Sequence, residues 1–265
     1  MNDVTKREDA FLSEAEGLGY DGFENVSMDM LSMPFLKVAQ PTSDEIVEGT
    51  SAYIPGLKAG EFFNSVSRER YGNELDMVIL YQESGFIEWE DKTFVARFTH
   101  EEVQALVAKG DVAKQEDGYI YVRKLNGNEI KENHTFFVML TEHMDAGPLL
   151  LSFKGTGLKH VRKWLTFARA QRIRKSSGEV IPAPLYSVVW RVKTVLNSNK
   201  EGNWYLLGDK NVNVKRVGDF TDETYFPGTQ QILDAVRFVM DVKTKINYKE
   251  QAGDGIEEKP LDEIL

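Results

Sequence analysis

The fold is decided by LLLSFKGTGLKHVRKWLTFAR, residues 149–169. Its first five residues form a short apolar run, which is typical of a buried β-strand. After a turn with two glycines, apolar residues recur at spacings of three and four, so that one stripe lies along a helix over residues 157–173. The stripe consists of Leu158, Val161, Leu165 and Ala168. The stretch therefore predicts a strand followed by an amphipathic helix.

Strand patterns lie on both sides of this stretch. They cover residues 75–81, 86–89, 119–122, 135–140, 185–196 and 204–207. Asn126-Gly127-Asn128 and the segment 197–203 supply turns for two hairpins. Two further helices are predicted, one over residues 99–107 that ends at Gly110 and one over residues 230–246. The pattern indicates a β-rich α+β fold, in which closure of the strands into a small barrel would remove unpaired strand edges.

The chain has 265 residues, 42% hydrophobic and 28% charged, and a formal net charge of −10. Residues 1–50 contain eleven acidic residues against three basic ones, and residues 250–265 contain six against one. We expect flexible acidic arms at both ends: an N-terminal arm over 1–32, a central domain over 33–249 and a C-terminal tail over 250–265. The tail ends in Leu261, Ile264 and Leu265. These side chains suit docking into an apolar pocket of a partner, although a frayed disordered end fits the tail equally well.

Several classes of protein are excluded by composition. The absence of cysteine excludes disulfides, iron–sulfur clusters, cysteine-ligated zinc and thiol nucleophiles. No run of 18 apolar residues is present, and the charged N-terminus does not resemble a signal peptide, so we expect a soluble intracellular protein without a membrane segment. No phosphate-binding loop, dinucleotide-binding glycine motif or nucleophile elbow occurs, and we expect no cofactor and no metal.

Basic residues gather in the interior of the chain. Residues 150–216 contain fourteen Lys and Arg against three acidic residues. Eight of them occur with no acidic residue among them: Lys154, Lys159, Arg162, Lys163, Arg169, Arg172, Arg174 and Lys175. Ordinary solvated helix faces usually mix charges of both signs, because like charges three and four residues apart repel. We therefore favour phosphate binding over a plain solvated surface.

Aromatic residues are interleaved with this charge, a mixture that suits single-stranded nucleic acid, because cations neutralise phosphates while unstacked bases lie on aromatic faces. Alternation along residues 186–193 places Tyr186, Val188, Trp190 and Val192 on one face, so Trp190 is expected to be buried while Arg191 and Lys193 point outward. The candidates for phosphates are Lys154, Lys159, Arg162, Lys163, Arg169, Arg172, Arg191 and Lys193. The candidates for base stacking are Trp164, Tyr186, Trp204 and Tyr205.

Signals for an enzyme are weaker. Glu129-Ile130-Lys131 has the Glu-x-Lys spacing of a metal-dependent nuclease, with Asp117 upstream as a possible partner carboxylate. Such short matches are common in a charged chain, and a charged hairpin turn explains this one. His134 and His143 do not have a standard zinc spacing.

Six segments, in this order, resemble tailed-bacteriophage proteins identified as single-stranded DNA-binding proteins, over about residues 33–207. They are MPFLKVAQ (33–40), PGLKAGEFFN (55–64), Tyr71-Gly72, FIEW (86–89), LKHVRKW (158–164) and WRV (190–192) followed by NWY (203–205). The resemblance implies an OB-fold barrel that coats single strands in phage replication and recombination. It also implies an acidic tail that contacts other replication proteins.

We therefore expect a sequence-nonspecific single-stranded DNA-binding protein of a bacteriophage, without catalysis, acting in the cytoplasm of the infected host. Its partners would be single-stranded DNA and, through the tail, phage or host replication and recombination proteins. Two alternatives stay open: a metal-dependent phage nuclease that uses Asp117, Glu129 and Lys131, and an acidic scaffold protein whose basic helix binds another protein.

Overall fold

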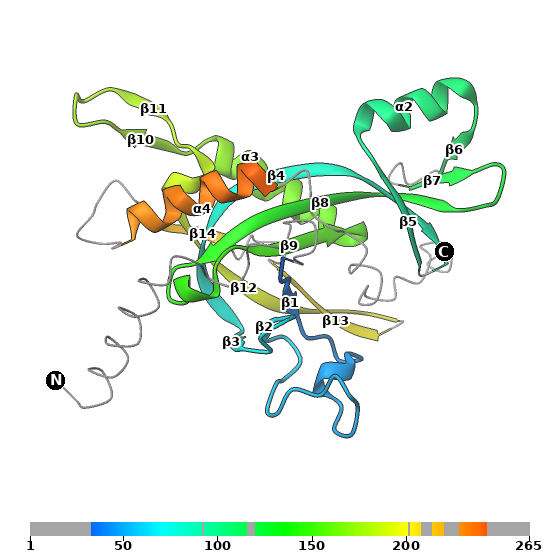
Figure 1. Cartoon of the computed structure of the whole chain (residues 1–265), viewed down its shortest axis with the longest axis horizontal. Coiled ribbons are helices and arrows are strands. Elements are labelled where there is room, and N and C mark those ends of the chain that lie inside the picture. The colour runs from blue at the N-terminus through cyan, green and yellow to red at the C-terminus, as the bar shows by residue number, and fades with distance from the viewer. Residues whose placement is uncertain are drawn as a thin grey trace, which may run out of the picture.

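A computed structural model describes residues 33–91, 93–115, 120–200, 202–207, 214–219 and 228–242. Strands dominate these residues, with three α-helices among them, and the predicted β-rich α+β class is confirmed (Figure 1). The helices are α2 (His100–Lys109), α3 (Leu158–Arg169) and α4 (Thr229–Val242). The predicted arm over 1–32 and tail over 250–265 lie outside the described residues.

Nine antiparallel strands form one curled sheet. They are β4 (Glu74–Glu90), β5 (Thr93–Phe98), β6 (Val112–Lys114), β7 (Ile120–Arg123), β8 (Glu129–Leu140), β9 (Leu149–Lys154), β12 (Val188–Asn199), β13 (Gly202–Leu207) and β14 (Val214–Asp219). The long strands β4 and β8 pair with each other along most of their length. At one end of the sheet β12 and β9 flank this pair, and at the other end β5 and β7 do.

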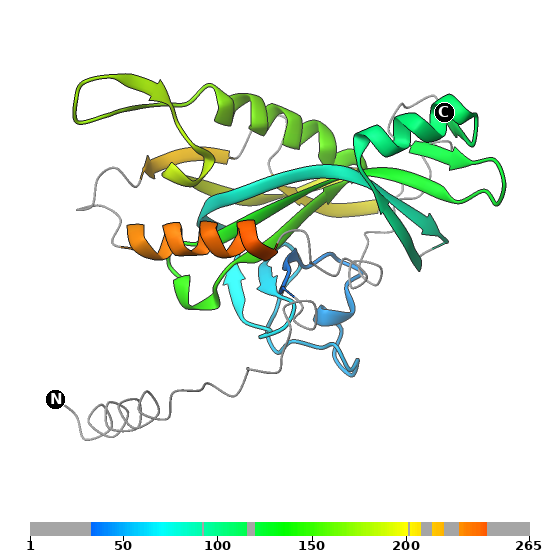
Figure 2. The same cartoon turned by 45° about the horizontal axis from the view of Figure 1, so that its top comes forward.

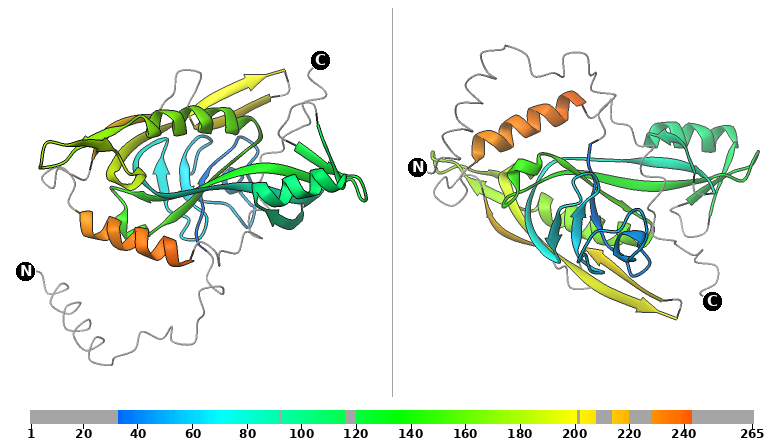
Figure 3. Two further views of the ribbon diagram at one scale, coloured as in Figure 1. Left: turned by 90° about the horizontal axis from the view of Figure 1, so that it is seen from above. Right: turned by 60° about the horizontal axis from the view of Figure 1, so that its bottom comes forward.

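The three helices cover different parts of the sheet. Helix α3 packs over the inner face of the curl, where Phe136, Trp190 and other apolar side chains form the largest core. Helix α4 packs on the opposite face against a second core that includes Val78 and Phe137. Figure 2 and Figure 3 show α3 and α4 on the two sides of the sheet. Helix α2 covers a third core at the far end.

A small sheet lies against the open side of the curl. It consists of β1 (Leu36–Val38), β2 (Phe62–Asn64) and β3 (Arg70–Gly72). On one side the Leu150 amide of β9 donates to the Pro34 carbonyl oxygen at 2.9 Å. On the other side Gln40 bonds both main-chain groups of Tyr205: its Nε2 donates to the carbonyl oxygen at 3.1 Å, and its Oε1 accepts from the amide at 2.8 Å. The small sheet therefore joins β9 to β13 across the opening.

Most predicted elements are present, with changed bounds. Helix α2 begins and ends as predicted, since Thr99 caps its first turn and Gly110 adopts a left-handed conformation at its end. The prediction that the helix over 157–173 continues to Ile173 is wrong, because α3 ends at Arg169. Residues 172–174 instead form strand β10 (Arg172–Arg174), which pairs with β11 (Val180–Pro182). The predicted strands over 75–81 and 86–89 are parts of the single strand β4.

No helix among the described residues is long and apolar enough to cross a membrane.

Candidate nucleic-acid interface

The exposed face of α3 carries four basic residues and no acidic one. Leu158, Val161, Trp164 and Ala168 are buried against the sheet, which turns the remaining side of the helix outward. The cations on that side are exposed: Lys159, Arg162, Lys163 and Arg169. The structure therefore brings four of the eight predicted phosphate-binding residues together on one helix face.

The β10–β11 hairpin continues this basic surface and projects beyond the end of α3 (Figures 1 and 2). Nη1 of Arg172 donates to the carbonyl oxygens of Arg169 and Gln171, each at 3.0 Å, which holds the guanidinium beside the helix end. Nη1 of Arg174 donates to the Gly178 carbonyl oxygen across the turn. Carbonyl oxygens position these two cations without neutralising their charge. Lys175, in contrast, pairs with Glu179 at 2.7 Å.

Arg216 on β14 joins the same surface, and sequence reasoning missed it. Its Nη1 donates to the Arg172 carbonyl oxygen at 3.0 Å. Arg216 lies opposite Trp190 in the β12–β14 register, so its side chain is on the face of the sheet that α3 covers. The strand that carries it was not predicted, because residues 214–219 show no clear alternation. We call Lys159, Arg162, Lys163, Arg169, Arg172, Arg174 and Arg216 the α3 basic surface.

One carboxylate reaches this surface from the sheet. Glu132 of β8 accepts from Nη2 of Arg162 at 2.8 Å and pairs with Nε2 of His134 at 3.0 Å. Nδ1 of His134 lies 3.2 Å from Nε2 of Gln82 on β4. The hydrogen bond from His134, together with the hydrogen bond and charge of Arg162, lowers the pKa of Glu132 against the opposing effect of its burial. Glu132 thus anchors the start of α3 to the sheet through a charged pair.

The prediction that Trp164 stacks on a base is wrong, because its ring is buried. Its ring is only 3% exposed and stacks on Phe136 at 5.0 Å between ring centroids. Trp190 contacts it edge to face at 6.1 Å. Trp164 is buried together with Leu158, Val161 and Ala168, and Leu165 is only partly buried, so the Trp164 ring lies inside the core.

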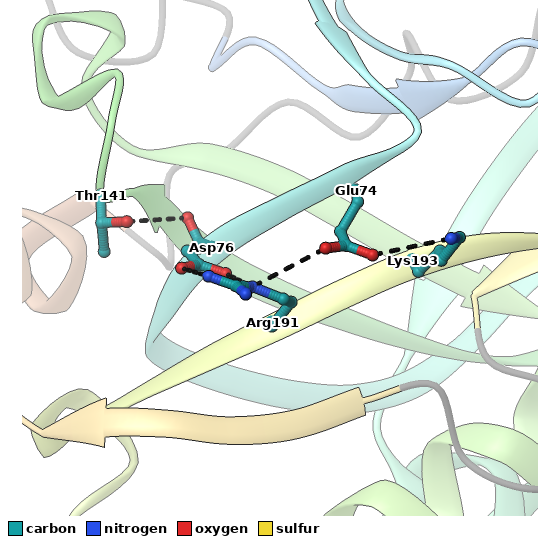
Figure 4. Close-up of polar contacts among 5 residues, drawn as sticks. All are labelled: Glu74, Asp76, Thr141, Arg191 and Lys193. Carbon is teal, nitrogen blue, oxygen red and sulfur yellow. Dashed lines mark hydrogen bonds and ion pairs between the residues drawn. The ribbon is translucent and has the colours of Figure 1, made fainter.

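Arg191 and Lys193 lie on the other face of the sheet from α3. Trp190 and Val192 point inward, and these two cations alternate with them and are exposed, as the alternation predicts. Both are paired, as Figure 4 shows: Arg191 forms two bonds to Asp76, at 2.7 and 2.8 Å, and Lys193 lies 3.7 Å from Glu74. The hydrogen bonds and charge of Asp76 raise the pKa of Arg191. These residues are therefore separate from the α3 basic surface.

Asp76 itself is held in place by the neighbouring strand. Its main-chain carbonyl oxygen accepts bonds from the amide and the hydroxyl of Thr141 (Figure 4). These bonds hold the main chain at the residue whose carboxylate pairs with Arg191.

The remaining candidates lie in several places. Lys154 follows the inward-facing Phe153, and its Nζ lies 5.2 Å from the centroid of the Trp89 ring. Tyr186 packs against the core under α4, which differs from the predicted placement beside Trp190. The Tyr205 ring lies so close to Gly60 that a Cβ there would be 2.5 Å from it. Trp204 pairs with Asn197 and is half-buried on the face of the hairpin that carries Lys193.

Four predicted residues lie outside the described residues: Leu261, Ile264 and Leu265 of the tail, and Asp117 of the nuclease alternative. Glu129 and Lys131, the other two residues of the nuclease alternative, form an ion pair at 2.8 Å. Within the described part of the chain, no group of three His, Asp or Glu side chains is placed to hold a metal ion.

Comparison with known proteins gives one family. The family described as Pam3 phage gp34-like protein matches residues 3–238. Searches of curated proteins and of solved structures gave no match. The matched range is wider than the 33–207 of the predicted resemblance, and it includes nearly all of the N-terminal arm.

Proposed function

From the premise that the chain belongs to the Pam3 phage gp34-like protein family, and so is a phage protein, we propose that it binds single-stranded DNA through the α3 basic surface. The observation that carries this proposal is the exposed face of α3, whose four cations lie beside an arginine-rich hairpin with no acidic residue between Lys154 and Gly178. Such a surface attracts a phosphate backbone and releases the counterions condensed on it.

The mode of binding follows from the geometry of the cations. They line a helix face and a hairpin rather than a site that could read base edges, so the affinity is independent of sequence. In this proposal the protein coats and protects strands during phage replication and recombination in the host cytoplasm, and it has no catalytic role. Its tail binds replication or recombination proteins.

We further propose that the curled sheet is an OB-fold-type barrel. The proposal is supported by the closure of its open side through β1–β3 and by the helix inserted between β9 and β12. A barrel of this type removes strand edges that would otherwise be open to aggregation.

The test is the salt dependence of binding to a labelled oligonucleotide. Replacing Lys159, Arg162 and Lys163 together by Ala should weaken binding and reduce the salt slope by up to about 2, because each phosphate contact on single strands contributes about 0.7. The matched control replaces Lys58, Lys109 and Lys124, three exposed lysines far from α3 in sequence, with the same loss of charge. Equal losses in both variants would show that only net charge matters and would refute the assigned surface.

Binding should also be weaker for a duplex of the same sequence. To separate binding from cleavage, the protein is incubated with the labelled oligonucleotide and Mg²⁺, and the length of the oligonucleotide is then measured by electrophoresis. Metal-dependent cleavage would support the nuclease alternative instead.

A further inference from the structure

One aromatic side chain on α3 is exposed. Phe167 is 42% exposed, although it lies in the same helix as the buried Trp164. Its ring contacts Trp190 at 5.7 Å between centroids with an interplanar angle of 67°. This contact supports the ring from the core side and leaves the rest of Phe167 exposed.

A cation of the α3 basic surface lies near this ring. Lys163 precedes Phe167 by four residues and so lies one turn away on the same side of α3. Gln171 follows the helix end, and its Nε2 donates to the Phe167 carbonyl oxygen at 3.0 Å. A nucleotide combines a flat apolar base with an anionic phosphate, and an exposed ring one turn from a cation matches both parts. An apolar protein partner would not need the cations.

We propose that Phe167 stacks against an unpaired base of the strand bound at the α3 basic surface. This inference rests on the proposed function. It adds the class of ligand: the surface binds nucleic acid with unstacked bases more tightly than it binds duplex DNA or a phosphate polymer. Phosphate contacts alone would not discriminate among these polyanions, because they carry the same repeating charge.

The experiment uses a fluorescent reporter at the proposed position in the full chain. In Phe167→Trp the new indole should be quenched when oligodeoxythymidylate binds, because a base stacks on it, and should be unaffected by inorganic polyphosphate. The matched control is Phe238→Trp, since Phe238 is 40% exposed on α4, on the other face of the sheet. The wild-type chain supplies the background signal, which comes from the buried Trp89, Trp164 and Trp190 and from the half-buried Trp204.

Affinity provides a second readout. Phe167→Ala should weaken binding of oligodeoxythymidylate roughly 5- to 150-fold, the range of one base–aromatic stack, and leave binding of polyphosphate unchanged. Phe238→Ala should change neither.

The outcomes separate the two proposals. If the wild-type chain binds no oligonucleotide, the proposed function fails. If it binds but Phe167→Ala binds equally well and the Phe167→Trp signal does not change, the inference alone is wrong. A loss of polyphosphate binding in Phe167→Ala would also overturn the inference, because it would show that the ring supports the helix instead of stacking on a base.

Discussion

Trp164 and Phe167 lie three residues apart on α3 and have opposite environments. The sequence predicted base stacking for Trp164 and made no assignment for Phe167, since both are aromatic residues next to basic ones. The assignment depends on the rotation of the helix about its axis, and the partly buried Leu165 allowed two neighbouring orientations of the stripe. The rings of Phe136, Phe153 and Trp190 on the sheet select the orientation that buries Trp164.

This difference predicts unequal losses of stability. Trp164→Ala should destabilise the protein by about 3–5 kcal/mol, because it leaves a cavity in the main core. Phe167→Ala should cost about 1 kcal/mol or less, because much of the ring is already exposed. Urea unfolding of both variants measures the two free energies, and similar losses would contradict the placement of the rings.

The surroundings of Glu132 in the folded protein determine its pKa and its contribution to stability. Its pKa is lowered in the folded protein, so its charged form stabilises the fold at pH values above its unfolded pKa. That contribution is lost as the pH falls through the folded pKa. Glu132→Gln should therefore be less stable than the wild type at pH 7, by about 1–3 kcal/mol. The difference should shrink in strongly acidic solution.

Unfolding curves of this variant at pH 7 and near pH 3 test the sign. The same substitution removes the carboxylate that pairs with Arg162, so oligonucleotide binding at low salt should strengthen at neutral pH. A constant stability difference across the pH range would mean that the charge of Glu132 does not contribute.

At the scale of elements, α2 could be predicted more fully than α3. Thr99, the acidic residues of the first turn and Gly110 mark the two ends of α2 in the sequence, and the structure uses all of them. The end of α3 has no such signal. It is set by the hairpin that follows, because Arg172–Arg174 pairs with Val180–Pro182. Capping residues and a glycine specify the first kind of boundary, and strand pairing in the next hairpin specifies the second.

The capping of α2 predicts a substitution that lowers stability and leaves the affinity for oligonucleotide unchanged. The Thr99 hydroxyl accepts from the Glu102 amide at 3.2 Å, and the Glu102 carboxylate accepts from the Thr99 amide at 2.7 Å. Thr99→Ala should cost about 1 kcal/mol of stability. Its affinity for oligonucleotide should equal that of the wild type, since α2 carries none of the α3 basic surface. Altered affinity would indicate that the α2 end takes part in binding.

At the scale of the whole molecule, the predicted set of phosphate ligands divides between the two faces of the sheet. The count of basic residues over 150–216 does not distinguish the faces, whereas the alternation at Trp190 does. Arg191 and Lys193 are thereby assigned to the face opposite α3, where Asp76 and Glu74 pair with them. Sequence reasoning located the basic region of the chain, and the topology decided which of its residues lie on the same face of the sheet.

The acidic tail gives a prediction at the same scale. Residues 251–265 carry five acidic residues and Lys259. Deleting them should strengthen oligonucleotide binding at low salt, because the deletion removes negative charge that would compete with DNA for the α3 basic surface. The effect should fade as salt screens it. The deletion should also abolish capture of replication or recombination proteins. Ile264→Ser with Leu265→Ser should lose only that capture. If the full-length, truncated and Ser-substituted chains capture identical partners, the tail is only a frayed end.

The shared strands β4 and β8 have a consequence for how the protein can be divided. Both strands run from the main core to the core under α2. A truncation that removes the core under α2 would therefore cut through β4 and β8, which also belong to the main core. The part of the sheet under α2 therefore cannot be removed from the protein as an independent domain. A shortened or transplanted version of the protein would have to keep both strands whole, and variation between relatives should be confined to the loops at the strand tips.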